Sequence, residues 1–392
     1  MKRITNPLTA IGTLALALAI VGYIAGWRLG WIELTVISCA CMLALLLALP
    51  FVLGRMQLDV ERGLAQNRVL VGDQATATFT FHNPRSTPVR GRELLDLVTS
   101  VNGDWKRHHP VKVPALGSGG SASDSYQLPK LGRGRYLVGP AVVSRADPLQ
   151  LMCRQVAHTE QDTLWVHPRY DPVAALPVGF AKDLEGPTSE TSPVGDVAFH
   201  SLREYSPGDD FRHIHWMSTA RANRPMVRHY VDNRRPHLAV LLDNGTEALG
   251  PDEFEIAVEI VASLAVSSFL HREPIAVWAG DEALLGRGAA GDRDTVLDQL
   301  ATVQQAGRFD ARPVAAALVR TEHGVSAMVY VTGGVASADL LPMVREVRRR
   351  ARVVVVRVWS PGASRHQPVP GAHVIDIETR SGFVAAWLGF AK

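Results

Sequence analysis

The sequence predicts a membrane-anchored multidomain protein with a two-helix transmembrane hairpin, an antiparallel β-sandwich-like module and a doubly wound α/β domain. Two uncharged apolar runs lie near the start of the chain, short strand patterns fill the middle, and buried strands alternate with helical patterns after residue 237. Its 392 residues suffice for about two or three domains. We expect a hairpin at 1–56, a β-rich domain at 57–170, a linker at 171–198, a charged segment at 199–236 and the α/β domain at 237–392.

The transmembrane hairpin is predicted from two runs without charge, Leu8 to Trp27 and Leu34 to Gly54. At about 1.5 Å per residue, each can cross a hydrocarbon core roughly 30 Å thick. A cleaved signal peptide is the alternative for the first run, but its apolar core is usually shorter and no A-x-A-like site follows. The short connection "RLGWIE" predicts an antiparallel pair with both ends on one side of the membrane.

Basic residues around the helices predict the orientation of the chain. Lys2 and Arg3 precede the first run, Arg55 and Arg62 follow the second, and the connection holds only Arg28. Because basic flanks are retained in the cytoplasm, we expect a multi-pass protein of the cell membrane with cytoplasmic soluble domains. The lipid bilayer is therefore one expected partner.

Composition argues against two other classes of protein. Two of the three cysteines lie inside the second apolar run, which excludes a disulfide framework in the soluble part. Net charge is only +3, so we expect no nucleic-acid partner.

The β-rich domain is predicted from short runs such as "ATATFTFHN", "VKVPAL" and "DTLWVHPR", which Gly, Pro and Asp separate. Runs at this spacing are typical of an antiparallel sandwich or open barrel. The glycines of "GRGRYLVG" fit neither a phosphate loop nor a dinucleotide fingerprint. Residues 171–198 are rich in Pro, Gly and Ser and predict a linker.

The α/β domain is predicted from the buried-strand pattern "LAVLLDN" and the helical pattern that follows it, "PDEFEIAVEIVASLAVSSFLH". Strands at "PIAVWAG", "SAMVYVTG", "RVVVVRVW" and "AHVIDIE" alternate with helices at "DRDTVLDQLATV" and "SADLLPMVREVRRR". Such a sheet binds ligands at the carboxyl ends of its strands.

A first strand that ends in Asp243 and leads into a helix resembles the von Willebrand factor A domain. That resemblance implies a metal-ion-dependent adhesion site with Asp-x-Ser-x-Ser after the first strand, a Thr and a later Asp. Here Gly245 and Glu247 replace the two serines, and Gly333 stands where the later acidic residue is expected. Magnesium would lose several oxygen ligands. We therefore expect no metal or other cofactor, with weak magnesium binding through Asp243 and Glu247 as the alternative.

The charged segment contains "LREYSPGDDFRHIHWMSTARANRP" at residues 202–225. Its long, irregular pattern resembles the signature of the domain-of-unknown-function 58 family. That resemblance implies a MoxR-type AAA+ ATPase as partner, and a transglutaminase-like membrane protein as a further one. The matching positions are Arg203, Glu204, Tyr205, Gly208, Asp209, Asp210, Arg212, Ile214, Trp216, Thr219, Ala220 and Arg221.

From its residue types, this stretch is predicted to act as a structural clamp or as a docking surface. Arg212 and Arg221 can form bidentate bonds with carboxylates such as Asp209, and a buried network of this kind would fix the segment against the α/β domain. Ile214 and Trp216 would then be buried. Exposed arginines would instead receive an acidic peptide or a phosphate.

A zinc site and a hydrolase active site are the two alternatives for this stretch. His213 and His215 form an H-x-H pair near His200 and His229, but no Cys or Glu-x-x-His cluster completes a zinc site. A hydrolase would use Asp209 as a base, yet the sequence has no nucleophile elbow and no nucleotide loop. The sequence therefore predicts a non-catalytic, membrane-tethered adaptor or assembly protein for envelope or metalloprotein maturation. A metal-dependent adhesion module using Asp243 is the alternative, and a hydrolase ranks last.

Overall fold

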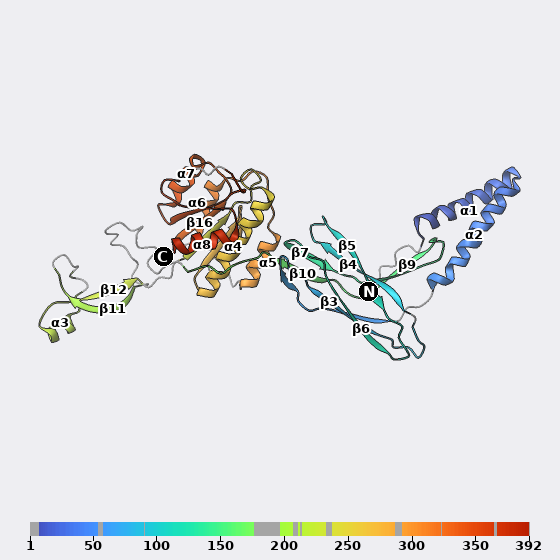
Figure 1. The fold of residues 1–392 in the computed structure, drawn as a ribbon, viewed down its shortest axis with the longest axis horizontal. Helices are drawn as coiled ribbons and strands as arrows, with labels where there is room; N and C mark the ends of the chain where they lie inside the picture. Colours follow the sequence, from blue (N-terminus) through green and yellow to red (C-terminus); the bar gives the residue numbers. More distant parts are fainter. Residues whose placement is uncertain are drawn as a thin grey trace. The chain divides into compact units, whose positions relative to one another are not determined.

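The computed structural model describes residues 8–53, 58–89, 91–175, 197–206, 211, 214–232, 237–286, 292–322, 324–363 and 367–391. The chain forms two compact units, Met1–His167 and Pro168–Lys392, whose elements are drawn in Figure 1. The first unit contains the helix pair and the β-rich domain, and the second contains a short hairpin and the α/β domain.

The helix pair consists of α1 (Ala10–Leu29) and α2 (Ile32–Leu53). Gly30 ends α1 at a φ of 69°, a left-handed conformation that glycine adopts without strain. A Cβ at Gly26 would lie 2.6 Å from the Thr35 hydroxyl, so glycine allows the two helices to approach closely. Both helices are long and apolar enough to cross a membrane, and they provide a membrane anchor. α4 (Pro251–His271) also meets this criterion, but most of it is buried in the α/β domain.

The β-rich domain consists of two sheets whose side chains meet in one core. All strand pairs are antiparallel except β10 with β2. Phe79 and Phe81 of one sheet and Leu94 and Val98 of the other are almost completely buried. The strands are β1 (Asp59–Leu64), β3 (Thr76–His82) and β6 (Ser121–Gln127) in the first sheet, and β2 (Arg68–Leu70), β4 (Arg92–Ser100), β5 (Lys106–Val113), β7 (Gly134–Val138), β8 (Val142–Ala146), β9 (Cys153–Ala157) and β10 (Asp162–His167) in the second.

A buried ion-pair network joins the two sheets of this domain. Arg62 on β1 binds Asp96 on β4 through an Nη1–Oδ1 contact of 2.9 Å and Asp162 on β10 through an Nη2–Oδ2 contact of 2.7 Å. Tyr126 on β6 donates a hydrogen bond of 2.8 Å to the second oxygen of Asp96. Burial raises the pKa of Asp96 above its ordinary value, although Arg62 opposes this shift. The network therefore places an arginine and a carboxylate inside a core that tolerates neither alone.

The α/β domain is a parallel sheet in the order β15-β14-β13-β16-β17-β18, with β15 antiparallel at the edge. This order is that of a doubly wound fold, in which β13 lies at the switch point. α4, α5 and α8 pack on one face, and α6 and α7 pack on the other. The elements are β13 (His237–Leu242), α4, β14 (Ile275–Ala279), β15 (Glu282–Leu285), α5 (Arg293–Thr302), α6 (Ala311–Thr321), β16 (Val325–Thr332), α7 (Ser337–Val347), β17 (Arg352–Val358), β18 (His373–Ile377) and α8 (Arg380–Phe390).

Residues 168–175, which we call the strap, pack against α4. The Asp171 N–H donates to the Ser263 hydroxyl at 3.1 Å, and the Val173 N–H donates to the Ser267 hydroxyl at 2.7 Å. Ser263 and Ser267 are four residues apart and therefore share one face of the helix. The predicted linker at 171–198 thus differs from the structure in its first five residues, because this stretch belongs to the packed domain.

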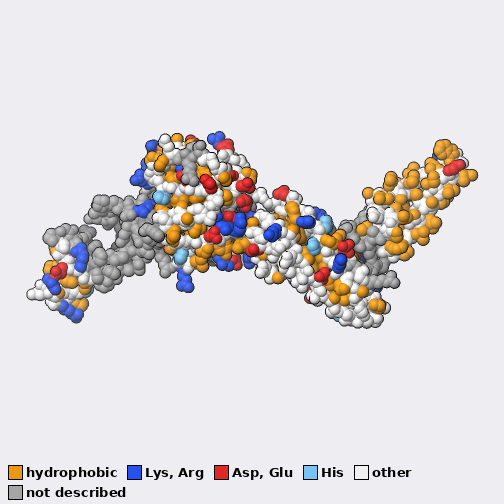
Figure 2. Space-filling model, viewed as in Figure 1, with side chains coloured by type: hydrophobic (Ala, Val, Ile, Leu, Met, Phe, Trp, Pro, Cys, Tyr) orange, Lys and Arg blue, Asp and Glu red, His pale blue; other side chains and the backbone are white. Residues whose placement is uncertain are grey.

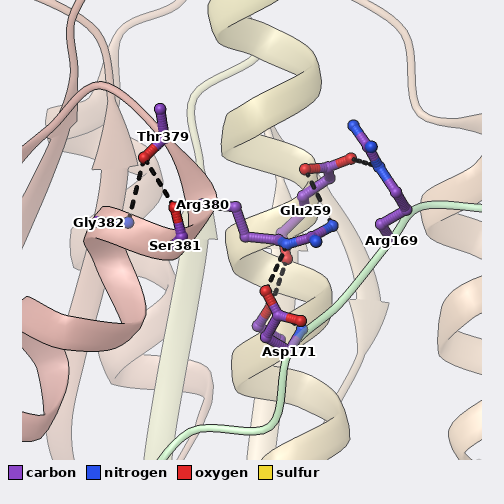
Figure 3. A network of polar contacts seen from close by, with 8 residues as sticks. Arg169, Asp171, Glu259, Thr379, Arg380, Ser381 and Gly382 are labelled. Carbon is purple, nitrogen blue, oxygen red and sulfur yellow. Dashed lines mark hydrogen bonds and ion pairs between the residues drawn. The ribbon is translucent and has the colours of Figure 1, made fainter.

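A charged cluster holds the start of the strap in place (Figure 3). Glu259 on α4 binds Arg169 at 2.7 Å and Arg380 of α8 at 3.4 Å, and Arg380 also binds Asp171 at 2.6 Å. At the other end, the Trp387 indole N–H donates to the Ala174 carbonyl at 2.9 Å. The strap is therefore fixed to both α4 and α8.

A Ser267→Ala substitution will loosen the strap, because it leaves the buried Val173 N–H without its acceptor. We expect a local loss of about 1–3 kcal/mol. Hydrogen exchange of residues 168–175 in the full-length protein measures this directly, and protection should fall. Ser381→Ala removes an exposed hydroxyl on α8 and should leave exchange unchanged. Equal protection in wild type and Ser267→Ala would show that the hydrogen bond contributes nothing.

Candidate functional site

The charged segment folds around a signature hairpin formed by β11 (Val197–Glu204), α3 (Trp216–Ala222) and β12 (Met226–Asp232). Ile214 forms an isolated bridge with Val227 on β12. Of the signature positions, Arg203 and Glu204 end β11, Tyr205 follows it, and Trp216, Thr219, Ala220 and Arg221 lie in α3. Gly208, Asp209, Asp210 and Arg212 lie outside the described residues, as does His213.

Local contacts explain why several signature residues occupy these positions. Tyr205 donates its N–H to the Pro225 carbonyl at 2.9 Å, which closes the open end of the strand pair. The Thr219 hydroxyl accepts from the Met226 N–H at 3.0 Å and so fixes α3 to the start of β12. Glu204 forms an ion pair with Arg224, a residue that the signature pattern does not include. Because both side chains are more than half exposed, this pair adds little stability.

His215 has a structural role in the hairpin. Its Nδ1 lies 2.7 Å from the Ser218 hydroxyl and accepts from the Ser218 N–H at 3.3 Å, which caps the N-terminus of α3. This nitrogen is therefore occupied within the fold. Among the residues that the structure describes, no group of three His, Cys, Asp or Glu side chains is placed to hold a metal ion.

Three large apolar side chains of the hairpin are exposed instead of buried. Phe211 is 68% exposed, Trp216 70% and Met217 66%. We call this set the hairpin patch. The expected burial of Trp216 in a clamp is not seen, because α3 has no buried residue. Phe211 stacks on Tyr205 at a centroid distance of 5.4 Å, so the hairpin supports this side chain of the patch with a second aromatic ring.

The second candidate site is the carboxyl edge of the α/β sheet, where Asp243 follows β13. Asp243 is 3% exposed. Its Oδ1 accepts from the Gly245 N–H at 2.8 Å, and its Oδ2 accepts from the Tyr330 hydroxyl at 2.6 Å and the Thr332 hydroxyl at 2.7 Å. Burial and the Asp243 charge raise the pKa of Tyr330 well above its ordinary value, which keeps this hydroxyl a donor. Both carboxylate oxygens are therefore used inside the fold.

The loop after β13 fills the crevice where a sheet of this kind binds ligands. A Cβ at Gly333 would lie 1.7 Å from the Ala248 carbonyl oxygen, so this loop contacts the backbone at the end of β16 directly. A Cβ at Gly245 would lie 3.1 Å from both Asp243 Oδ1 and the Cβ of Phe309. The glycines that replace the expected serine and acidic residue therefore allow the chain to close over its own crevice.

Glu247, the other predicted oxygen ligand, has a side chain that is 69% exposed, and its Oε2 lies 3.9 Å from Arg308 Nε. The Gln305 side chain donates to the Leu249 carbonyl at 2.8 Å and holds the far end of the loop. The three hydrogen bonds to Asp243 take most of the acceptor capacity of its carboxylate, so a metal ion at Asp243 and Glu247 would compete with them.

Comparison with known proteins identifies the second half of the chain. Residues 201–383 match the family model described as "Protein of unknown function DUF58". This region belongs to the DUF58 family. The match begins inside β11, includes the whole signature stretch from residue 202 and ends in α8, so the resemblance inferred from the signature is confirmed.

One curated relative and several solved structures are similar to parts of the chain. "Uncharacterized protein YeaD" of Bacillus subtilis (strain 168) is 27% identical over 232 residues, which cover 55% of this chain and 56% of that protein. The chain therefore spans little more than half of the relative's length.

The solved structures include the C-terminal domain of wzt, 14% identical over 29% of this chain and 75% of that chain, with a TM-score of 0.22. A CARDB domain from Pyrococcus furiosus in complex with di-metal ions is 16% identical over 28% of this chain and 92% of that chain, with a TM-score of 0.19. Similarities at such low TM-scores support no conclusion about fold or function.

Proposed function

We propose that this DUF58 protein is a non-catalytic, membrane-tethered adaptor that docks a partner protein through its signature hairpin. The observation that carries the proposal is the hairpin patch: Phe211, Trp216 and Met217 are exposed within the region that matches the family model. Exposed aromatic and methionine side chains are typical anchors of protein interfaces. The patch fits a docking role and not an internal clamp.

The closed crevice supports a non-catalytic role. Asp243 accepts three hydrogen bonds from its own fold, and the Ala248 carbonyl occupies the space beside Gly333. Neither a substrate nor a metal ion can reach this edge at Asp243 without rearrangement of the loop. We propose that the domain keeps the von Willebrand factor A-like architecture, with a first strand that ends in Asp243, but has lost the adhesion chemistry.

The partner proposed from the family resemblance is a MoxR-type AAA+ ATPase on the cytoplasmic side of the membrane. A transglutaminase-like membrane protein is a further proposed partner. The complex would act in envelope or metalloprotein maturation. The basic residues that flank the helix pair support the cytoplasmic orientation.

A pull-down from native membranes tests the docking role. We expect Trp216→Ala to reduce recovery of an AAA+ ATPase at least tenfold, because an anchoring tryptophan typically contributes about 2 kcal/mol or more to an interface. The matched control is Leu388→Ala, which removes an apolar side chain that is 49% exposed on α8. Both variants should fold normally, since both side chains are on the surface. Equal recovery with wild type and Trp216→Ala would contradict docking through the hairpin.

A further inference from the structure

The turn that joins β8 to β9, residues 147–152, contacts the membrane-spanning helices directly. The Thr9 N–H donates to the Leu151 carbonyl at 3.1 Å, and Leu8 forms an antiparallel bridge with Met152. A Cβ at Gly12 would lie 1.9 Å from the Leu151 carbonyl oxygen, so α1 has a glycine where this turn meets it. The turn is thus packed against the anchor within one compact unit.

The contact lies inside the apolar length of the helices. Leu151 belongs to a small core with Leu45 and Ala48 of α2. Leu45 lies six residues before Phe51, where the apolar span of α2 ends. At about 1.5 Å per residue, this places Leu45 about 9 Å inside that end. Interfacial protein segments bury their apolar side to about 5–10 Å. The turn therefore reaches the boundary between lipid headgroups and acyl chains.

Several of the turn's polar backbone groups are satisfied from within the protein, which suits a location close to lipid. The Asp147 carboxylate accepts from the Leu149 N–H at 2.9 Å and from the Met152 N–H at 2.6 Å. The Gln150 N–H donates to the Asp147 carbonyl at 2.9 Å, and the Thr9 hydroxyl donates to the Gln150 carbonyl at 2.6 Å. Asp147 and Thr9 thus supply hydrogen bonds that an ordinary surface turn would take from water.

The tip of the turn is apolar and exposed. Leu149 is 65% exposed, in a turn that packs against the helix pair. An exposed leucine at this position suits the apolar part of a bilayer better than water.

We propose that the β8–β9 turn is a third membrane-contacting element, which inserts Leu149 into the headgroup–acyl boundary of a phospholipid bilayer beside the helix pair. The β-rich domain is then held to the membrane at a second point and cannot rotate freely about the end of α2. This inference does not depend on the proposed docking function, because it uses only the first compact unit.

Lipid-depth quenching of full-length protein tests the proposal. Cys39, Cys41 and Cys153 are first replaced with alanine, and Leu149→Cys is labelled with bimane in vesicles of phosphatidylcholine and phosphatidylglycerol. Doxyl groups on the lipid chains should quench this label, and aqueous iodide should quench it several-fold less than a surface label. The matched control is Val101→Cys, at the turn after β4, where the native side chain is 47% exposed. It should show the reverse pattern.

The proposal is overturned if iodide quenches Leu149→Cys as strongly as Val101→Cys, or if doxyl lipids do not quench it. Should Leu149→Cys fail to fold, Pro148→Cys provides the same measurement from the neighbouring exposed position.

Discussion

A Gly333→Asp variant will destabilise the α/β domain and will not create a magnesium site, although it supplies the acidic residue of the adhesion pattern. The reason is steric: any Cβ at this position would lie 1.7 Å from the Ala248 carbonyl oxygen, a backbone atom that cannot move alone. Overpacking typically costs about 1–3 kcal/mol, and a rigid backbone atom as the obstacle favours the upper end of that range. The simpler Gly333→Ala variant carries the same clash without a charge and should be destabilised comparably.

Chemical denaturation of the purified full-length protein measures this loss of stability. Hydrogen exchange of the β13 and β16 amides then shows whether the loss lies in the α/β domain. The matched control is Gly307→Ala, because a Cβ at Gly307 has no neighbour within 4 Å. It should change stability by no more than about 1 kcal/mol. A stable Gly333→Asp protein whose melting temperature rises with magnesium would show that the crevice is open to metal after all.

An Arg62→Leu variant will destabilise the β-rich domain by roughly 3–5 kcal/mol, because Asp96 then remains as an uncompensated charge in the core. Arg62 is 1% exposed and Asp96 0%, so water cannot replace the lost partner. The double variant Arg62→Leu with Asp96→Leu removes both charges and should be markedly more stable than Arg62→Leu alone.

Hydrogen exchange of the β4 and β10 amides in nanodiscs reports on this domain separately from the α/β domain. Lys106→Leu on the exposed end of β5 is the control and should have an effect within about 0.5 kcal/mol. If Arg62→Leu leaves exchange unchanged, the network is not what joins the two sheets.

The main architecture could be predicted from the sequence because its signals are periodic. Uncharged runs predict the spanning helices, and continuous apolar runs predict the central strands of the parallel sheet. β15, α6 and α8 were not predicted. β15 is only four residues long and follows β14 after a tight turn at Gly280. α6 has Pro313 in its first turn, and α8 follows the last strand with almost no polar face.

The candidate site was predictable only at the level of residue types. Gly245 and Gly333 stand where the adhesion pattern expects ligands, which led to the prediction of no metal site, and the packing of the loop explains why both positions are glycine. The strap could not be predicted, because residues 168–175 carry no periodic pattern. Its signal was on α4, where Ser263 and Ser267 lie at a spacing of four residues in the apolar middle of the helix.

The kind of side chain at the surface differs between parts of the chain. Figure 2 shows apolar side chains gathered over the helix pair and mixed charges over the α/β domain. The proposed functions depend on two places where large apolar side chains are exposed outside the transmembrane helix pair: the hairpin patch and the turn at Leu149. The first is proposed to bind protein and the second lipid.

Photocrosslinking in native membranes tests the central claim, docking through the signature hairpin, most directly. A photoreactive amino acid replaces Met217 in the hairpin patch or, as control, Leu388 on α8, and crosslinks are compared with and without ATP and magnesium. We predict a nucleotide-dependent crosslink from position 217 to an AAA+ ATPase and none from position 388. Absence of that crosslink at position 217, or equal crosslinking at both positions, would contradict the account.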